Sequence, residues 1–394
     1  MRIITFGKIN MKFLIPIIGG IIRLIYRFLV NINSKYEIIL KNPFILSIYT
    51  SIGMVFAFIP YIILKYRSKK INSNIHENKS KLNIELVHYD IFKKTRLKKY
   101  KLILASSICD FSETLIIYTF CMKCIYNLWM FDILFMSVFS YFLLKTKLYK
   151  HQYLSMIIII VLGLVLNVLE YFKSENNYEF NVLEILMKFL GEIFLSLCIV
   201  ITKYNMEKNY CNPYEICIWD GLFGVILHII CLLIINKLEL TIADVNYPDN
   251  FWELINNYDI NDFLICLLVI IVGASYNICL LLTCNYFTPC HIIISYIIHE
   301  YYYYIHINDN NFELNILGFF ILVLILFMFL IFIEIIEINI FNISYNTKKN
   351  IELRSRIDSL IDFNSLLNIN EEIEPEEMEI INSYSKIYED FIRK

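Results

Sequence analysis

Long apolar runs constrain the fold of this chain more than any other feature. Each of ten stretches is close to the ~20 residues that a helix needs to cross a ~30 Å hydrocarbon core. Backbone groups inside lipid must find hydrogen-bond partners within the chain, so runs of this length are expected to be helices. Hydrophobic residues make up 58% of the 394 residues. The runs cover residues 13–30, 44–64, 102–120, 125–144, 152–172, 182–202, 214–236, 263–283, 289–306 and 314–338.

The predicted fold is therefore an all-α polytopic membrane protein with ten transmembrane helices. Residues 1–338 form the membrane domain, which lies in the lipid bilayer. The first run is interpreted as a span and not as a signal peptide, because no small-residue cleavage site follows it. Arg23 and Arg27 lie four residues apart in this run and share a helix face, so they are expected to reach the interface or to face a polar interior.

Basic residues are concentrated in alternate loops. Lys and Arg are frequent in residues 65–101, 145–150 and 203–213, whereas residues 173–181 and 237–262 are neutral or acidic. Cytosolic loops carry the excess of Lys and Arg, so this alternation places both termini in the cytosol and supports the count of ten spans.

The count of ten also predicts how the two halves are related. A duplicated unit with an odd number of spans has opposite orientations in its two copies, which is the inverted-repeat plan of many secondary transporters. We therefore expect a 5+5 inverted repeat, with the binding site near the midplane between the two halves. This expectation follows from helix count and orientation alone.

The remaining residues, 339–394, are predicted to form an acidic cytosolic tail. Residues 362–367 read D-x-x-x-L-L, and Tyr384 and Tyr388 each begin a Y-x-x-apolar string. Such strings resemble sorting signals, so cytosolic sorting proteins are candidate partners of the tail. They also arise by chance in tails rich in Ile.

Two carboxyl groups lie within the third apolar run. Asp110 and Glu113 are three residues apart and share one face of a helix. A charge at bilayer depth costs roughly 2.5 to 3.5 kcal/mol on insertion scales, which makes an intramembrane acid a candidate functional residue. Both are candidate substrate- or proton-binding groups. The alternatives are pairing with Lys123 or Arg23, or packing in the neutral form that burial favours.

Asp132 lies in the middle of the fourth run. Helices three and four are joined by a short connection and are expected to be neighbours, so Asp132 could cluster with Asp110 and Glu113 and bind substrate or a proton. An interhelical hydrogen bond from Ser or Thr to Asp132 is the alternative.

Polar residues also occur in the second half. Asn277 in the eighth run and His299 in the ninth are candidate substrate- or proton-binding groups, and a hydrogen-bonded core role is the alternative for His299. Glu300 is expected to point away from His299 because the two are adjacent. In the seventh run, Gly221 is expected to permit close helix approach together with Gly224, and Asp220 is interpreted as an interfacial acid.

Several classes of protein are disfavoured. The sequence contains no GxxxxGK[ST], HExxH or GxSxG motif, which disfavours an ATPase, a zinc protease or a hydrolase of those types. Its 11 Cys include one isolated C-x-x-C, Cys121 with Cys124, and no metal-binding framework. The net charge of −2 suggests no nucleic-acid partner. We expect no catalytic residue, no cofactor and no metal, and a small molecule as substrate.

Short motifs occur in a fixed order along these runs. The three main ones are Asn42-Pro43-Phe44-Ile45-Leu46 with Ser51-Ile52-Gly53, Ile108-Cys109-Asp110-Phe111, and Trp219-Asp220-Gly221-Leu222-Phe223-Gly224 after Asn212-Pro213. Weaker ones are Lys147-Leu148 with His151-Gln152-Tyr153 and Gly163-Leu164-Val165, and Leu317-Gly318-Phe319. Over about residues 12–338 this order resembles the drug/metabolite transporter superfamily, and within it the nucleotide-sugar-transporter-like solute carriers of family 35, subfamily F. The resemblance implies a carrier fold in an intracellular membrane such as that of the Golgi, endosome or lysosome.

The chain departs from that family at its fourth helix. There the family usually carries an Arg and a Gly, and this sequence reads Tyr126-Asn127-Leu128-Trp129-Met130. The ninth run also lacks the family's Arg and Asp pattern, and the family's Glu-Glu-Lys at the end of the sixth helix is reduced here to Thr202-Lys203. The loss of the Arg argues against carrying over an anionic nucleotide-sugar substrate.

These observations predict a secondary-active transporter of a small polar metabolite that works by alternating access, with one acid as a candidate for proton exchange. The first alternative is a non-transporting membrane protein that keeps the fold as an interaction scaffold, which the lost Arg and Gly favour. The second is a membrane-embedded enzyme that uses the acids and His299, which we consider the weakest of the three.

Overall fold

The computed structural model describes residues 4–6, 11–32, 43–66, 85–120, 128–173, 182–238, 260–306 and 312–338. All of them belong to one compact unit, Met1–Asn339. The predicted tail, with its candidate sorting strings, lies outside the described residues, as do Lys123 and the Cys121/Cys124 pair.

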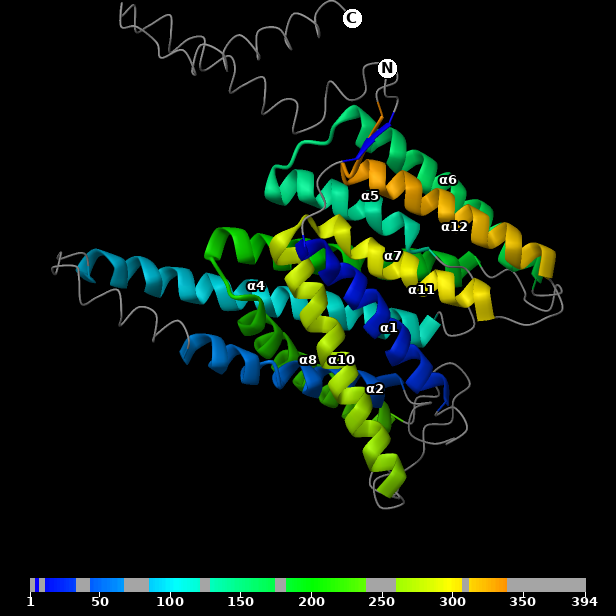
Figure 1. The fold of residues 1–394 in the computed structure, drawn as a ribbon. Coiled ribbons are helices and arrows are strands. Elements are labelled where there is room, and N and C mark those ends of the chain that lie inside the picture. Colours follow the sequence, from blue (N-terminus) through cyan, green and yellow to red (C-terminus); the bar gives the residue numbers. More distant parts are fainter. Residues whose placement is uncertain are drawn as a thin grey trace, which may run out of the picture. The chain divides into compact units, whose positions relative to one another are not determined.

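Helices dominate the described part of the chain (Figure 1). Each of the ten apolar runs overlaps one of the longer helices. Six of the helices are long and apolar enough to cross a membrane, which fits an integral multi-pass membrane protein. These six candidate spans are Leu46–Tyr66, Lys150–Phe172, Val182–Asn209, Pro213–Ile234, Phe263–Tyr286 and Leu314–Phe332. The helices are α1 (Leu14–Ile32), α2 (Pro43–Val55), α4 (Glu85–Phe120), α5 (Met130–Phe139), α6 (Lys150–Lys173), α7 (Val182–Asn209), α8 (Pro213–Leu238), α10 (Ile260–Tyr286), α11 (Ile293–His306) and α12 (Phe312–Phe332).

The helix bounds differ from the apolar runs at several ends. Helix α4 has 36 residues and begins at Glu85, within the stretch predicted as a loop, because residues 85–101 contain good helix formers and no Gly or Pro. Its length of ~54 Å exceeds the ~30 Å hydrocarbon core. The last helix ends at Phe332, not at 338, and Glu334 then adopts a left-handed φ of 62°. Hydropathy did not separate this helix from the apolar residues after it.

The second apolar run contains a helix break. Helix α2 ends at Val55, residues 56–57 form a turn, and residues 58–66 are helical again. Pro60 explains the break, because it has no N–H to donate to the carbonyl of Phe56. That carbonyl accepts the N–H of Ile59 at 3.1 Å instead.

Two short strands lie at the ends of the helical unit. Strand β1 (Ile4–Phe6) precedes α1, and strand β2 (Ile336–Ile338) follows α12. They pair antiparallel, with Thr5 opposite Glu337, and lie together near the end marked N in Figure 1. This small sheet was not expected from the helical pattern. It brings the start of the first apolar run beside the end of the last.

The helices pack mainly across the two halves of the chain. The most extensive packing joins α4 to α7, α2 to α8, α1 to both α10 and α11, and α6 to α12. The predicted role of Gly221 in close helix approach is confirmed, because a Cβ added there would lie 2.6 Å from the carbonyl oxygen of Ser51. A Cβ added at Gly53 would lie 2.4 Å from the carbonyl oxygen of Ile270.

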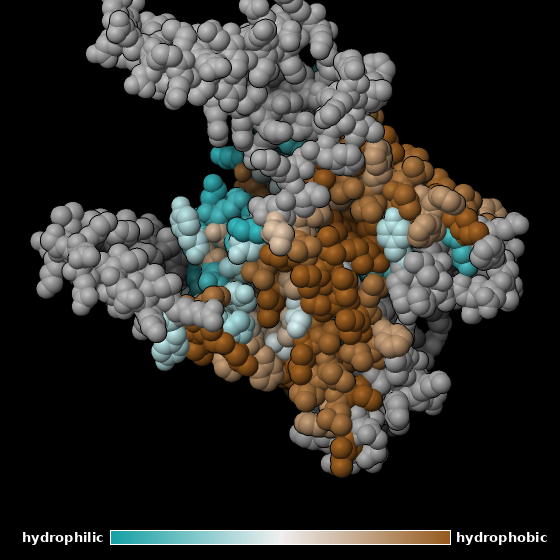
Figure 2. Space-filling model, in the orientation of Figure 1, coloured by the Kyte–Doolittle hydropathy of each residue, from teal (hydrophilic) through white to brown (hydrophobic). Residues whose placement is uncertain are grey.

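The outer surface of the bundle is apolar. Figure 2 shows a continuous hydrophobic surface over the region of α1 and α10. On α1 the exposed side chains Ile18, Ile21 and Ile25 recur every three or four residues and form one face of the helix. An apolar face of this kind suits contact with lipid, and it leaves the opposite face of α1, which carries Arg23, directed into the bundle.

Candidate functional site

A cavity of about 360 Å³ lies inside the helix bundle. This is the lower end of the ~300–1,000 Å³ range of small-molecule sites. Its lining residues come from α1, α2 and α4 in the first half of the chain and from α7, α8, α10 and α11 in the second. Both halves of the chain therefore line the cavity.

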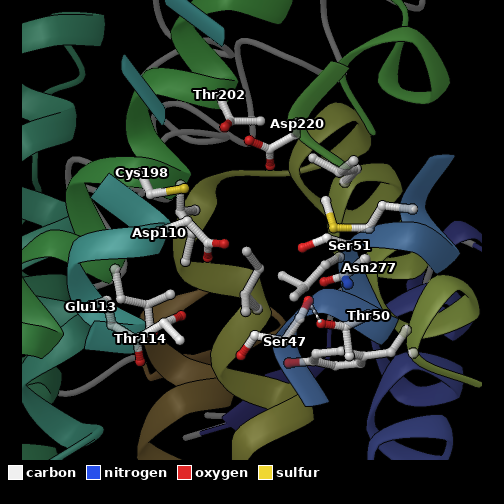
Figure 3. Close-up of a pocket in the computed structure, with 18 of the residues that line it drawn as sticks. Ser47, Thr50, Ser51, Asp110, Glu113, Thr114, Cys198, Thr202, Asp220 and Asn277 are labelled. Carbon is white, nitrogen blue, oxygen red and sulfur yellow. Dashed lines mark hydrogen bonds between the residues drawn. The ribbon is translucent and has the colours of Figure 1, made fainter. Parts of the chain in front are cut away.

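Carboxyl groups form one side of this cavity. Asp110 and Glu113 lie one helix turn apart on α4, and Asp220 of α8 lies nearby, as Figure 3 shows. The hydroxyl of Ser107 donates a hydrogen bond to Asp220, which joins α4 to α8. Within the described residues, none of the three carboxyls forms an ion pair with Lys or Arg. Glu113 accepts a hydrogen bond from the hydroxyl of Thr114 at 3.4 Å.

Uncharged polar groups form the facing side. Ser47, Thr50 and Ser51 of α2 and Asn277 of α10 lie across the cavity from Asp110 and Glu113 in Figure 3. The hydroxyl of Thr50 donates to the carbonyl oxygen of Ser47 at 2.9 Å. These side chains offer both donors and acceptors to a polar solute.

A single arginine also lines the cavity. The guanidinium of Arg23 lies 4.1 Å from the ring centroid of Tyr296 and 5.7 Å from that of Tyr276. One of its nitrogens donates to the hydroxyl of Tyr276 at 3.4 Å. Two aromatic rings from α10 and α11 thus hold the cation in place.

A second group of charged residues lies apart from the cavity lining. Asp132 is fully buried, accepts a hydrogen bond from Ser196 at 3.2 Å through Oδ1, and lies within hydrogen-bonding reach of Glu192. Glu192 in turn lies 3.6 Å from the ammonium of Lys188, one turn earlier on α7. The Oδ2 atom of Asp132 has no partner in the described structure unless a proton sits between the two carboxyls. A protonated Asp132 that donates to the Glu192 carboxylate satisfies every one of these groups.

His299 and Glu300 contact each other, contrary to the expectation that they point apart. Nδ1 of His299 lies 3.3 Å from Oε1 of Glu300, and both residues are buried in α11. Adjacent residues on a helix differ by ~100° in direction, and a long Glu side chain spans that angle.

The candidate residues chosen from sequence therefore divide into two groups. Asp110, Glu113 and Asn277 line the cavity, whereas Asp132 and His299 do not. Asp220, interpreted from sequence as an interfacial acid, lines the cavity as well.

One charged residue was missed at the sequence level. Glu192 lies within the apolar run 182–202, the same signal that identified Asp110, and Lys188 precedes it at the spacing of a helical ion pair. The described residues contain no group of three or more His, Cys, Asp or Glu positioned to hold a metal ion.

Comparison of the chain with protein-family models and with curated proteins finds no match.

Proposed function

We propose that the chain is a secondary carrier that moves a small polar metabolite across a membrane by alternating access. Its ten helices would form two inverted halves of five, with both termini and the basic loops in the cytosol. The observation that carries the proposal is the cavity itself, in which Asp110, Glu113 and Asp220 lie across from uncharged polar side chains within an apolar helix bundle. Carboxyl groups at such depth are costly and mark the paths of solutes or ions.

The pairing of the two short strands supports an even number of membrane crossings. Strand β1 precedes the first helix and β2 follows the last, and the two are hydrogen-bonded to each other. In the proposed arrangement the chain would enter and leave the helical unit on the same side of the membrane. Ten crossings satisfy this condition, and an odd number does not.

The packing of the helices supports the inverted repeat. Each helix of the first half is matched with the one five places later, so that α1 corresponds to α7, α2 to α8, α4 to α10, α5 to α11 and α6 to α12. Under this exchange the α4–α7 contact becomes α10–α1, the α1–α11 contact becomes α7–α5, and the α10–α2 contact becomes α4–α8. The α2–α8 and α6–α12 contacts map onto themselves. A pseudo-two-fold relation between halves produces this pattern.

The position of the cavity also fits alternating access. In inverted-repeat carriers the substrate site lies at the interface of the repeats, and each half in turn opens toward its own side. The resemblance to the drug/metabolite transporter superfamily points the same way, and it suggests an intracellular membrane as the location.

The proposal includes coupling to a proton at Asp132. Several titratable groups lie near Asp132 and influence whether it holds a proton when the halves move. They are Glu192 of α7, which Lys188 contacts in turn, Glu113 of α4, Tyr296 of α11, and Cys290 of the short helix η4 (Pro289–Ile292). A shift of α5 against α7 would separate Asp132 from Glu192 and so release or take up a proton.

An exchange experiment with purified full-length protein tests the carrier function. Proteoliposomes are loaded with a cell extract of small metabolites and placed in an isotopically labelled extract, and mass spectrometry then identifies which labelled compounds enter. Wild-type vesicles are expected to accumulate at least one metabolite in a saturable way, and Asp110→Asn vesicles to accumulate far less of it. Lys147→Gln, an exposed charge change outside the cavity, serves as the control. Absence of any protein-dependent exchange would contradict the carrier and favour the interaction scaffold.

A further inference from the structure

The cavity contains charges of both signs that do not pair with each other. Asp110, Glu113 and Asp220 lie on the side formed by α4 and α8. Arg23 also lines the cavity and is held by Tyr276 of α10 and Tyr296 of α11. No ion pair between Arg23 and an acid is present within the described residues. The lining thus contains both an acidic group and a cation, and we refer to the three acids as the acidic end of the lining and to Arg23 as the cationic end.

The cationic end has donors to spare. A guanidinium carries five N–H donors in a planar fork that matches a carboxylate, and Arg23 uses one of them on a phenol hydroxyl. The guanidinium also lies near the rings of Tyr276 and Tyr296, and Glu300 of α11 acts on it electrostatically without forming an ion pair. An anionic group of a solute in the cavity would accept the donors that remain.

The acidic end favours a cationic group of a ligand. Asp110 and Glu113 are one turn apart, and Asp110 lies between Glu113 and Asp220 in Figure 3. Among the described residues no Lys or Arg forms an ion pair with any of the three, and Lys188 of α7 acts on Glu113 only at longer range. A primary or quaternary ammonium would relieve the mutual repulsion of these groups. A purely anionic solute would be repelled by the three acids, and a purely cationic one would be repelled by Arg23.

We infer that the cavity binds a small zwitterion of the amino-acid type, with its ammonium at Asp110, Glu113 and Asp220 and its carboxylate at Arg23. This inference rests on the proposed carrier function and specifies the substrate class. The volume of about 360 Å³ suits a molecule of this size. The facing hydroxyls of Ser47, Thr50 and Ser51 then contact the body of the solute.

Counterflow of three labelled probes into proteoliposomes of the full-length protein tests the inference. The zwitterionic probe is a mixture of the twenty amino acids with γ-aminobutyrate and glycine betaine. The cationic probe is tetraethylammonium and the anionic probe is lactate. Vesicles preloaded with the unlabelled form of each probe are expected to accumulate the zwitterions, and neither of the other two probes.

Charge variants test which residues bind the carboxylate of the zwitterion and which bind its ammonium. Arg23→Gln removes the partner of the carboxylate, and losing a hydrogen bond to a charged group is expected to weaken zwitterion binding about 10- to 100-fold. The same variant is expected to admit tetraethylammonium, because the acids remain and the cation is gone. Asp110→Asn is expected to weaken zwitterion binding without admitting tetraethylammonium. Lys147→Gln, which changes an exposed charge, is expected to match wild type.

The failures of the inference and of the carrier are distinguishable. Uptake of tetraethylammonium or lactate by the wild-type protein, or exchange of extract metabolites with none of the zwitterions moving, would overturn the substrate class and leave the carrier intact. Zwitterion uptake that Arg23→Gln does not change would overturn the assignment of the cationic end. No exchange of any probe or extract metabolite would overturn the proposed function and the inference together.

Discussion

Replacing glycine with alanine at two helix crossings should separate the helices that enclose the cavity. At Gly53 the added Cβ lies 2.4 Å from the carbonyl oxygen of Ile270, and at Gly221 it lies 2.6 Å from the carbonyl oxygen of Ser51. Both obstacles are backbone atoms, which cannot rotate away. Ordinary contact begins at 3.4 Å, so the helices must move apart by 3.4 − 2.4 = 1.0 Å at Gly53 and 3.4 − 2.6 = 0.8 Å at Gly221.

The expected cost follows from these displacements. Overpacking of a dense interior costs about 1–3 kcal/mol, and backbone obstacles belong at the upper end of that range. Alanine recovers about 1 kcal/mol of helix propensity. Each variant should therefore lose about 2 kcal/mol of stability, from the balance of these two effects.

Gly191 provides a matched control on α7, because its added Cβ would lie 3.5 Å from Ile117, an ordinary contact. Gly191→Ala should keep the propensity gain of about 1 kcal/mol without the clash. The two kinds of variant should thus differ by about 3 kcal/mol, or about 6 °C at ~2 °C for each kcal/mol. The detergent-solubilised proteins are heated in steps, and size-exclusion chromatography measures how much folded protein remains at each temperature. The resulting melting temperatures give this difference. Equal melting temperatures for Gly53→Ala and Gly191→Ala would refute the account of the crossings.

Three further predictions concern single residues. Asp132→Asn should fold normally, because an amide can donate to Glu192 and accept from Ser196, and its uptake rate should lose the pH dependence of the wild type; full retention of the wild-type pH profile would exclude Asp132 from coupling. Glu215→Gln breaks the partly exposed ion pair with Lys99 and should cost no more than about 1 kcal/mol, less at high salt, as thermal unfolding in 0.05 and 1 M NaCl would show. Burial raises the pKa of Cys211 to about 11, so its thiolate is scarce at neutral pH. The rate of its alkylation by iodoacetamide in the folded protein should therefore rise with pH up to about pH 11. A rate that is already constant above about pH 9 would contradict this.

Helix positions followed from sequence because lipid leaves the backbone little choice. Their ends did not, because ends depend on features that hydropathy does not report. Helix α4 continues back to Glu85 through charged residues that are good helix formers, and α2 breaks at residues 56–57 because of Pro60, three residues later. The pairing of β1 with β2 joins residues more than 300 positions apart and leaves no local signal.

The candidate site was accessible from sequence only in part. Asp110 and Glu113 were identified because a carboxyl in an apolar run is costly wherever the helix packs. The setting of Arg23 could not be inferred, since Tyr276 and Tyr296 approach it from helices α10 and α11, which are distant in sequence. Asp220 was interpreted as a membrane-interface residue because it lies near the end of its apolar run. Its hydrogen bond from Ser107 depends on how α4 crosses α8, which the sequence does not report.

Water accessibility of Asn277 tests most directly whether a solute path runs between the two halves. Asn277→Cys lines the cavity, and Ile271→Cys on the same helix α10 lies on the outer face, where Ile271 is 53% exposed. Intact vesicles are treated with a membrane-impermeant thiol reagent from one side or the other, and labelling of each position is read by mass spectrometry of its peptide. Alternating access predicts that position 277 is labelled from both sides and position 271 from neither. Absence of labelling at position 277 from both sides would contradict a solute path through this cavity.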